Sequence, residues 1–371
     1  MTTPTKKIVI SINTSWNIIN FRLNLLKYLQ TQGYQIIAFA PVDKYSKQFK
    51  KNNILFEPLT MENKGHNPIK DILLLKQYHS LLKKYRPDAA LFFTIKPNIY
   101  GTLAASLLKI PIINNVSGLG TTFLHKNWIS TTAHILYKFS FKFSKKVFFQ
   151  NKDDKKLFIE KKLINAQITD VLPGSGVDLK EFTPSPLPEK LHILFIGRLL
   201  FDKGIIEFLE SCKAIKAIHG KTVDFSIIGK LEESHQLGVS EQILQKYTRI
   251  GAVTYLGTTD KIKEEIAKAS VIILPSYREG TPRSLLEGAA MSRPLLATNV
   301  PGCKDLIRDN YNGWLCKVKN TKDLTLAIEK VIQTDKKKLI EFGTNSRTFV
   351  EQNYSEQLVF EKYNEALKSI L

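Results

Sequence analysis

The amino-acid sequence predicts an α/β protein made of two doubly wound domains. Two series of short, apolar, β-branched runs alternate with amphipathic runs, one series in each half of the 371 residues. This alternation is typical of βαβ units and of a mainly parallel sheet. Residues 173–188, between the two series, are dense in Pro and Gly, as expected of a connecting segment. We therefore place the first domain at 1–183 and the second at 184–354.

The elements follow in chain order. Apolar runs predict strands in the first half at 7–12, 35–40 and 89–94. Amphipathic runs predict helices there at 21–30 and 69–85. In the second half, strands are expected at 191–197, 223–229, 253–256 and 271–274. Helices are expected at 204–219, 240–246 and 261–269, and a last helical pattern covers 355–370.

The positive charge of the chain is concentrated in its first half. Residues 1–170 carry 26 Lys and Arg against 9 Asp and Glu, a net charge of +17, whereas residues 171–371 carry 28 against 25, a net charge of +3. An anionic partner of the first half is therefore expected. Composition does not choose among nucleic acid, a membrane surface and a phosphorylated substrate, and part of the lysine excess could be a compositional bias of the source.

Several classes of protein are disfavoured by what the sequence lacks. The apolar run at 7–12 is too short for a secretory signal, and no stretch reaches the length of a bilayer span. Three cysteines without C-x-x-C spacing favour neither a disulfide framework nor a zinc site. The histidines are scattered and no Asp-x-Asp pair occurs, so we expect no metal and no other cofactor.

The most informative segment is 272–291, which predicts a buried strand, a tight loop and a helix. Thr281 is the expected N-cap and Pro282 the first helical residue. The amides near Arg283, Ser284 and Leu285 would then lack intrahelical partners, and such a helix end attracts phosphate. Glu279 lies before the cap and Glu287 more than a turn inside the helix. Two solvated carboxylates on a capped helix are the simpler interpretation of this pair.

A second segment places cations beside a buried strand. Gly197 and Arg198 follow the strand expected at 191–197, and Lys203 and Gly204 open the next helix. Gly197 allows a close backbone approach, and two cations near a helix N-terminus suit a diphosphate. A solvated turn is the alternative interpretation when the segment is considered alone.

Together, the two segments resemble the motifs of retaining glycosyltransferases of family 4, which have the GT-B fold of two Rossmann-like domains facing across a cleft. The E-x7-E spacing of Glu279 and Glu287 and the G-R-x-x-x-x-K-G spacing from Gly197 to Gly204 carry the resemblance. Gly176-Val-Asp178 with Phe182 is similar to the family's interdomain segment. In that fold the last helix, here 355–371, crosses back to the first domain.

The resemblance implies roles for individual residues. Glu279 would contact hydroxyls of the transferred sugar, and Glu287 would hold the ribose. Arg198 and Lys203 would neutralise the departing diphosphate and, with Glu279, would be the catalytic residues. The implied donor site consists of Gly197, Arg198, Lys203, Tyr255, Glu279, Gly280, Thr281, Arg283, Ser284, Leu285 and Glu287. Tyr255 would lie near the base, although a plain strand end explains it equally well.

The first half carries family-like residues at expected strand ends, where doubly wound sheets bind ligands. The segment from Asn115 to Thr121 resembles the V-x-G-L-G of members that act on lipid-linked sugars, but Ser117 stands where many of them have His. The acceptor-side candidates are Asn17, Arg22, His66, Lys96, Asn98, Ser117 and Gly118. An exposed loop histidine is the plainer interpretation of His66.

The stretch 123–149 interleaves aromatic residues with lysines. A basic amphipathic helix of this kind can lie on an anionic bilayer. The alternative is that the aromatic residues are core and the lysines a solvated face.

These observations lead to one main expectation and two alternatives. The resemblance implies a monomeric, metal-independent, retaining enzyme that takes a UDP-sugar and a polyprenyl-diphosphate-linked acceptor at the cytoplasmic face of a bacterial membrane. Members that add an N-acetylhexosamine, including the N-acetylgalactosaminyltransferases of bacillosamine-based protein glycosylation, are most similar. An epimerase acting on a UDP-sugar is one alternative. A basic nucleic-acid-binding protein is the other, although familiar nucleic-acid motifs are missing.

Overall fold

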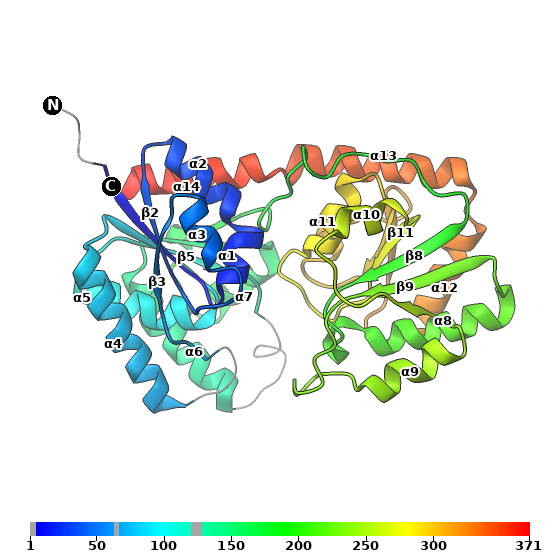
Figure 1. The fold of residues 1–371 in the computed structure, drawn as a ribbon, viewed down its shortest axis with the longest axis horizontal. Helices are drawn as coiled ribbons and strands as arrows, with labels where there is room; N and C mark the ends of the chain where they lie inside the picture. Colours follow the sequence, from blue (N-terminus) through cyan, green and yellow to red (C-terminus); the bar gives the residue numbers. More distant parts are fainter. Residues whose placement is uncertain (1–4, 63–66, 120–127) are drawn as a thin grey trace. The chain divides into compact units, whose positions relative to one another are not determined.

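The computed structural model describes residues 5–62, 67–119 and 128–371. The chain forms two compact units (Figure 1). Residues 1–175 and 356–371 make up the first unit, and residues 176–355 the second. Each unit contains one parallel sheet with helices on both faces, so the prediction of two Rossmann-like α/β units is confirmed.

The described part of the first unit contains a parallel sheet of order β3-β2-β1-β4-β5-β6-β7. Its strands are β1 (Lys7–Ser11), β2 (Gln35–Ala40), β3 (Leu55–Pro58), β4 (Ala89–Phe93), β5 (Ile112–Val116), β6 (Lys146–Phe149) and β7 (Thr169–Val171). The α-helices are α1 (Ser15–Phe21), α2 (Leu23–Thr31), α3 (Lys47–Lys51), α4 (Pro68–Tyr85), α5 (Thr102–Leu107), α6 (Trp128–Ser140), α7 (Lys152–Glu160) and α14 (Glu356–Ile370). Short turns of other helix types are η1 (Pro97–Gly101), η3 (Phe141–Phe143) and η4 (Ala166–Ile168).

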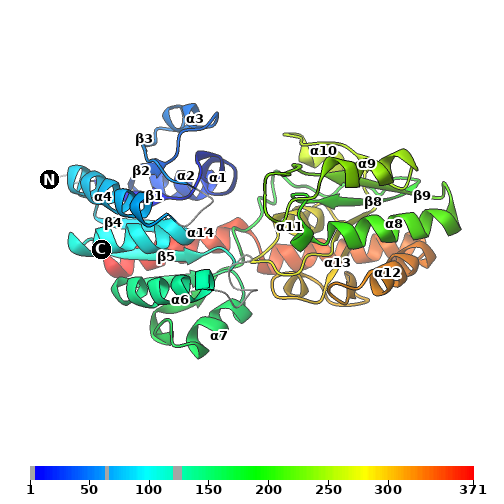
Figure 2. The same ribbon diagram turned by 90° about the horizontal axis from the view of Figure 1, so that it is seen from below.

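The C-terminal helix α14 packs into the core of the first unit. Val359 and Tyr363 are buried in the same cluster as Ile8 and Ile10 of β1. Figures 1 and 2 show α14 lying along α2, far from it in sequence. Val9 of β1 lies in a different cluster, because neighbouring strand residues face opposite sides of a sheet.

The second unit has the strand order β10-β9-β8-β11-β12-β13, again parallel. Its strands are β8 (Leu191–Ile196), β9 (Val223–Ile228), β10 (Thr254–Tyr255), β11 (Val271–Leu274), β12 (Leu295–Thr298) and β13 (Gly313–Cys316). The α-helices are α8 (Ile205–His219), α9 (Glu241–Arg249), α10 (Ile262–Ala267), α11 (Arg283–Ala290), α12 (Thr321–Gln333) and α13 (Lys336–Asn353). Two short 3₁₀ turns are η5 (Phe201–Lys203) and η6 (Lys304–Leu306).

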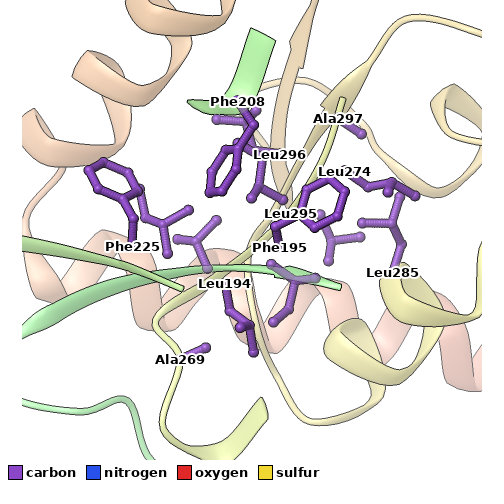
Figure 3. Close-up of a cluster of buried hydrophobic side chains, with 14 of the residues drawn as sticks. Leu194, Phe195, Phe208, Phe225, Ala269, Leu274, Leu285, Leu295, Leu296 and Ala297 are labelled. Atoms are coloured by element: carbon purple, nitrogen blue, oxygen red, sulfur yellow. The ribbon is translucent and has the colours of Figure 1, made fainter. Parts of the chain in front are cut away.

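The core of this unit covers both faces of its sheet. Figure 3 shows Leu194 and Phe195 of β8 among the buried side chains, with Phe208 of α8 and Leu285 of α11. Adjacent residues of one strand are therefore both buried, as expected of a parallel sheet between two layers of helices. This explains why continuous apolar runs predicted β8, β9 and β11, whereas β12 and β13 were not predicted.

The predicted domain boundary after residue 183 is too late. Residues 176–183 pack with the second unit: Val177 N donates to Tyr354 O over 2.9 Å, and Phe182 is buried in the second core. Arg347 Nη1 donates to Phe182 O over 2.7 Å. The Pro and Gly composition marked the segment correctly, but these contacts move the boundary to residues 175/176.

One prediction about helix bounds also needs correction. The first helical segment was expected at 21–30, whereas the chain forms α1 from Ser15 and then α2 from Leu23. Thr14 caps α1, since its Oγ1 accepts from Asn17 N over 3.0 Å. This side-chain cap starts the helix earlier than the apolar periodicity indicated.

Arg293 fastens the connecting segment to the second unit. Its guanidinium is fully buried and donates to Ser185 O and Oγ, Pro186 O, Ile266 O and Ala267 O over 2.6–3.1 Å. Burial lowers the pKa of Arg293 to about 10, so it stays protonated at neutral pH.

We predict that Arg293→Met lowers the free energy of unfolding by about 3 kcal/mol, because buried carbonyl groups lose their donors. Arg249→Met, which changes an exposed residue of α9, is the control and should change it by less than about 0.5 kcal/mol. Urea denaturation of the two variants and the wild type measures both values. Equal small losses would contradict this role for Arg293.

Candidate functional site

The two motifs of the second half meet at the carboxyl ends of neighbouring strands. β8 lies between β9 and β11, where the strand order of the sheet reverses. The Lys203 ammonium, in the loop after β8, forms an ion pair with the Glu279 carboxylate, in the loop after β11. Their side chains are only 17% and 15% exposed. The structure thus brings together two predicted site residues that are far apart in sequence.

Glycines allow these loops to approach each other. Gly204 has a φ of +69°, and a Cβ there would lie 2.0 Å from Pro275 O. Gly197 lies close to the loop after β9, since a Cβ on Gly229 would lie 1.7 Å from Gly197 O. A backbone bond also joins the loops after β8 and β11, since Tyr277 N donates to Asp202 O over 2.8 Å. A larger residue at Gly204 would push the two motifs apart.

Arg198 is exposed, unlike Lys203. Within the described ranges its guanidinium has no hydrogen-bonded or ion-paired partner. It follows Gly197 directly, in the same loop as Lys203. The loop after β8 therefore offers two cations, one held by a carboxylate and one in contact with solvent.

The helix after Glu279 starts one residue later than predicted. Pro282, not Thr281, is the N-cap: its backbone is extended, with ψ at 120°, and its carbonyl accepts the first helical bond from Leu286 N over 3.2 Å. The amides of Arg283, Ser284 and Leu285 still precede the first intrahelical donor. The Leu285 side chain is fully buried (Figure 3), so only its backbone amide can contact a ligand.

Glu287 lies on α11 and is 8% exposed. Arg283 Nε and Nη2 both reach Glu287 Oε1, over 3.0 and 2.9 Å. Burial raises the pKa of Glu287, and the Arg283 charge and hydrogen bond only partly offset it. Glu287 is therefore a buried acid whose Oε1 is contacted by two nitrogens of Arg283, rather than a solvated surface acid.

Tyr255 ends β10, at the edge of the sheet. Its hydroxyl donates to Gly229 O over 2.9 Å, and Gly229 N donates to Gly257 O over 2.8 Å. These bonds attach the loop after β10 to the loop after β9, which in turn touches Gly197. The predicted donor-site residues thus form one connected group of loops within the second unit.

In the first unit, two acceptor-side candidates, Asn98 and Ser117, bond to Asn115, and a third, Arg22, contacts Phe93. Asn115 Nδ2 donates to the Tyr363 hydroxyl of α14 and its Oδ1 accepts from Ser117 Oγ, both over 2.8 Å. Asn98 Nδ2 donates to Asn115 O over the same distance. The Arg22 guanidinium lies 4.9 Å from the centroid of the Phe93 ring. Tyr363 also packs on Phe93, with 5.9 Å between the ring centroids.

Not all of these candidates face solvent. Asn98 is fully buried and Arg22 is 4% exposed, so both are interior groups in this structure. Asn17, in the first turn of α1, and Ser117 and Gly118, directly after β5, are half-buried.

Lys96 and His66 are the remaining acceptor-side candidates. Lys96 Nζ is held by Asp71 Oδ1 over 2.8 Å, and the Tyr100 hydroxyl donates to Asp71 Oδ2 over 2.8 Å. His66 lies outside the described residues.

The stretch 123–149 is not one amphipathic helix. It forms α6, η3 and the buried strand β6, and residues 123–127 lie outside the described chain. Tyr137, Phe141, Phe148 and Phe149 are core residues, as the alternative interpretation of this stretch expects. The exposed remainder, called the α6 patch below, consists of Ile135, Lys138, Phe139, Lys142, Phe143 and Lys145.

In the part of the chain that the structure describes, no three His, Cys, Asp or Glu side chains form a cluster suited to a metal. No described helix has both the length and the apolar character of a membrane span.

Sequence reasoning missed two residues that organise these groups. Tyr363 lies on the last helix, which was predicted from its helical period alone, and Gly302 lies in the loop after β12, where no site residue was predicted. A glycine directly after a proline in a loop beyond an apolar strand is a signal for Gly302. No local signal marks Tyr363, because its partner Asn115 is remote in sequence.

The raised pKa of Glu287 gives a pH-dependent prediction. The native state binds this proton more tightly than the unfolded chain, whose carboxyl pKa is 4.5. The resulting stabilisation is present below that pH and is lost as the pH rises through the native pKa. We predict that wild-type stability relative to Glu287→Gln falls between about pH 4 and about pH 7. Chemical denaturation at both pH values measures it, and an increase would contradict the assignment.

The comparisons with known proteins agree with this geometry. The family model of group 1 glycosyl transferases matches residues 179–349, and that of glycosyl transferase 4-like proteins matches residues 7–151. The N,N'-diacetylbacillosaminyl-diphospho-undecaprenol alpha-1,3-N-acetylgalactosaminyltransferase of Campylobacter jejuni is 27% identical over 369 residues, which cover 94% of each chain. The UDP-Gal:alpha-D-GlcNAc-diphosphoundecaprenol alpha-1,3-galactosyltransferase of Escherichia coli is 25% identical, over 77% of this chain and 76% of the relative.

A solved structure shows the same fold. The Anabaena protein Alr3699/HepE in complex with UDP and glucose superposes with a TM-score of 0.82 and 17% identity, over 98% of this chain and 100% of that one. The resemblance inferred from the motifs is thus confirmed. The chain belongs to the group 1, family 4-like glycosyltransferases of the GT-B fold, and it is a glycosyltransferase.

Proposed function

We propose that the enzyme transfers an N-acetylhexosamine from a UDP-sugar, with retention of configuration, to a polyprenyl-diphosphate-linked saccharide in bacterial glycan or glycoprotein biosynthesis. The ion pair between Lys203 and Glu279 is the observation that carries the donor-site part of the proposal. It places the Lys203 ammonium, which suits a phosphate, beside the Glu279 carboxylate, which suits sugar hydroxyls. The names of the C. jejuni and E. coli relatives support a lipid-linked acceptor.

The chemistry needs no protein nucleophile. The acceptor oxygen bonds to the anomeric carbon as the bond from that carbon to the diphosphate oxygen breaks, and UDP leaves with the electron pair. The acceptor proton passes to the leaving diphosphate on the same face of the sugar. Lys203, Arg198 and the amides at the start of α11 would stabilise the charge that grows on the diphosphate. Glu279 and Glu287 would orient the sugar and the ribose.

A product assay tests the proposal. The protein is incubated with a bacterial lipid extract and a panel of radiolabelled UDP-sugars, and label in the lipid phase and free UDP are measured. We expect both to appear with UDP-N-acetylgalactosamine or another UDP-N-acetylhexosamine, and the new linkage to keep the donor's anomeric configuration by NMR. Conversion of the donor to an isomer without UDP release would instead support an epimerase.

Lys203→Ala should lower kcat by about 100-fold, because the diphosphate loses a charge partner that acts mainly in the transition state. Lys261→Ala removes an equal charge from a side chain of the same unit that is 73% exposed, and it should leave kcat unchanged. Steady-state kinetics with the active UDP-sugar measures both. A change in KM for the donor alone would mean that Lys203 binds the ground state and the transition state equally.

Metal independence is part of the proposal. The two cations and the helix N-terminus supply positive charge that a divalent ion would otherwise bring to the diphosphate. Saturating EDTA should therefore leave the transfer rate within about twofold of the untreated rate. A loss of activity that magnesium or manganese restores would contradict it.

We also propose that the first unit docks on an anionic membrane from the cytoplasmic side, as a monomer. The α6 patch supports this, because its apolar members Ile135, Phe139 and Phe143 are 63%, 52% and 42% exposed and alternate with three exposed lysines. Phe139 and Phe143 meet edge to face, with 5.7 Å between the ring centroids. Apolar insertion and lysine attraction, at about 1 kcal/mol per lysine, would add together.

Replacing Lys138, Lys142 and Lys145 by Gln should weaken binding to anionic liposomes by at least about tenfold at low salt. Replacing Lys47, Lys50 and Lys51, exposed on α3 of the same unit, removes the same charge and should have little effect. Co-sedimentation with anionic and neutral liposomes measures both. Equal losses in the two variants would show that net charge rather than the α6 patch determines binding.

A further inference from the structure

The loop after β12 lies directly against the loop that carries Glu279. Glu279 N donates to Pro301 O over 3.2 Å. Gly302 has a φ of +82°, and a Cβ there would lie 2.6 Å from Glu279 O and 2.5 Å from Gly280 O. Any side chain at position 302 would therefore displace the backbone of Glu279. The absence of a Cβ at Gly302 is a geometric requirement of the donor-site loop.

Asp305 and Tyr354 hold Gly302 in turn. Gly302 N donates to Asp305 Oδ2 over 3.1 Å, and the Tyr354 hydroxyl donates to Asp305 O over 3.0 Å. The Tyr354 ring packs against Phe349, with 5.8 Å between the ring centroids. Burial and the Asp305 charge raise the pKa of Tyr354, so its hydroxyl stays protonated and remains a donor at neutral pH.

Tyr354 also lies where the chain leaves the second unit. Val177 N donates to Tyr354 O over 2.9 Å, and Val177 forms a β-bridge with Ser355. The chain enters the second unit at residue 176 and leaves it after residue 355. The segment that enters the second unit and the segment that leaves it are therefore hydrogen-bonded to each other at Tyr354. One continuous set of contacts runs from there through Asp305 and Gly302 to Glu279.

We propose that Gly302, Asp305 and Tyr354 are positioning residues for Glu279, which set where its carboxylate meets the donor sugar. None of them needs to touch the ligand. The inference rests on the proposed function, in which Glu279 binds the sugar and not the nucleotide. Positioning matters there because hydrogen bonds to hydroxyls weaken steeply when the acceptor moves or tilts, and catalytic geometry tolerates shifts of only about 0.5 Å.

The test compares the affinities for UDP-N-acetylgalactosamine and for UDP by isothermal titration calorimetry, so it needs no acceptor. Glu279→Gln is the reference and should lower the preference for the UDP-sugar over UDP about tenfold. Gly302→Ala and Tyr354→Phe should each lower the same preference at least about threefold, with UDP affinity within about twofold of wild type.

Two matched controls separate positioning from general damage. Gly251→Ala places an alanine at a φ of +69° with no heavy atom within 4 Å of the new Cβ, so it carries the backbone strain without the collision. Tyr247→Phe removes another tyrosine hydroxyl of the same unit, which donates to Glu210. Both controls should keep the wild-type preference.

The outcomes separate a failure of the positioning role from a failure of the proposed function. If Glu279→Gln loses the preference while Gly302→Ala and Tyr354→Phe keep it, the positioning role is wrong and the proposed function stands. Equal losses in the controls would likewise overturn the positioning role. If Glu279→Gln itself keeps the preference, Glu279 does not bind the sugar, and the proposed role and this inference both fail.

Discussion

The contact between the loops after β8 and β11 is the constraint on which the rest of the site depends. β8 is the strand at which the order of the second sheet reverses, so its carboxyl end has a neighbouring loop on each side. The Lys203–Glu279 ion pair joins the loop after β8 to the loop after β11. The close approach of Gly229 to Gly197 O joins it to the loop after β9. Sheet topology thus brings the cation loop, the two carboxylates and the start of α11 into one group.

Close backbone packing contributes to keeping these loops in place, together with side-chain bonds such as that from Ser276 Oγ to Asp202 O. Gly204 accommodates Pro275 O and Gly302 accommodates Glu279 O, each at a positive φ. A half-buried ion pair contributes little net stability, because desolvation offsets much of the attraction. We therefore regard the Lys203–Glu279 pair as a consequence of loop packing that holds both groups ready for a ligand. Elsewhere on the same unit, Arg293 and Arg347 hold the connecting segment through hydrogen bonds to its carbonyl groups.

The features that depend on local pattern were predictable from the sequence, and it predicted them. Continuous apolar runs predicted buried strands such as β8 and β11, and motif spacing singled out Lys203 and Glu279, whose side chains form an ion pair in the structure. What it missed depends on tertiary contacts. The shift of the N-cap to Pro282 is set by one ψ angle, and the burial of Phe141 beside the exposed Phe139 depends on which helix face meets the sheet. The observed domain boundary lies before the predicted one because Val177 pairs with Ser355, a partner remote in sequence.

The central claim is that the loops after β8 and β11 form the site for the nucleotide diphosphate. A crystal structure of the protein with UDP tests it most directly. The account predicts diphosphate oxygens within about 3.2 Å of Lys203 Nζ, of the Arg198 guanidinium and of amides between Arg283 and Leu285, with the ribose at Glu287. A diphosphate bound elsewhere on the second unit, or UDP bound only to the first unit, would contradict it.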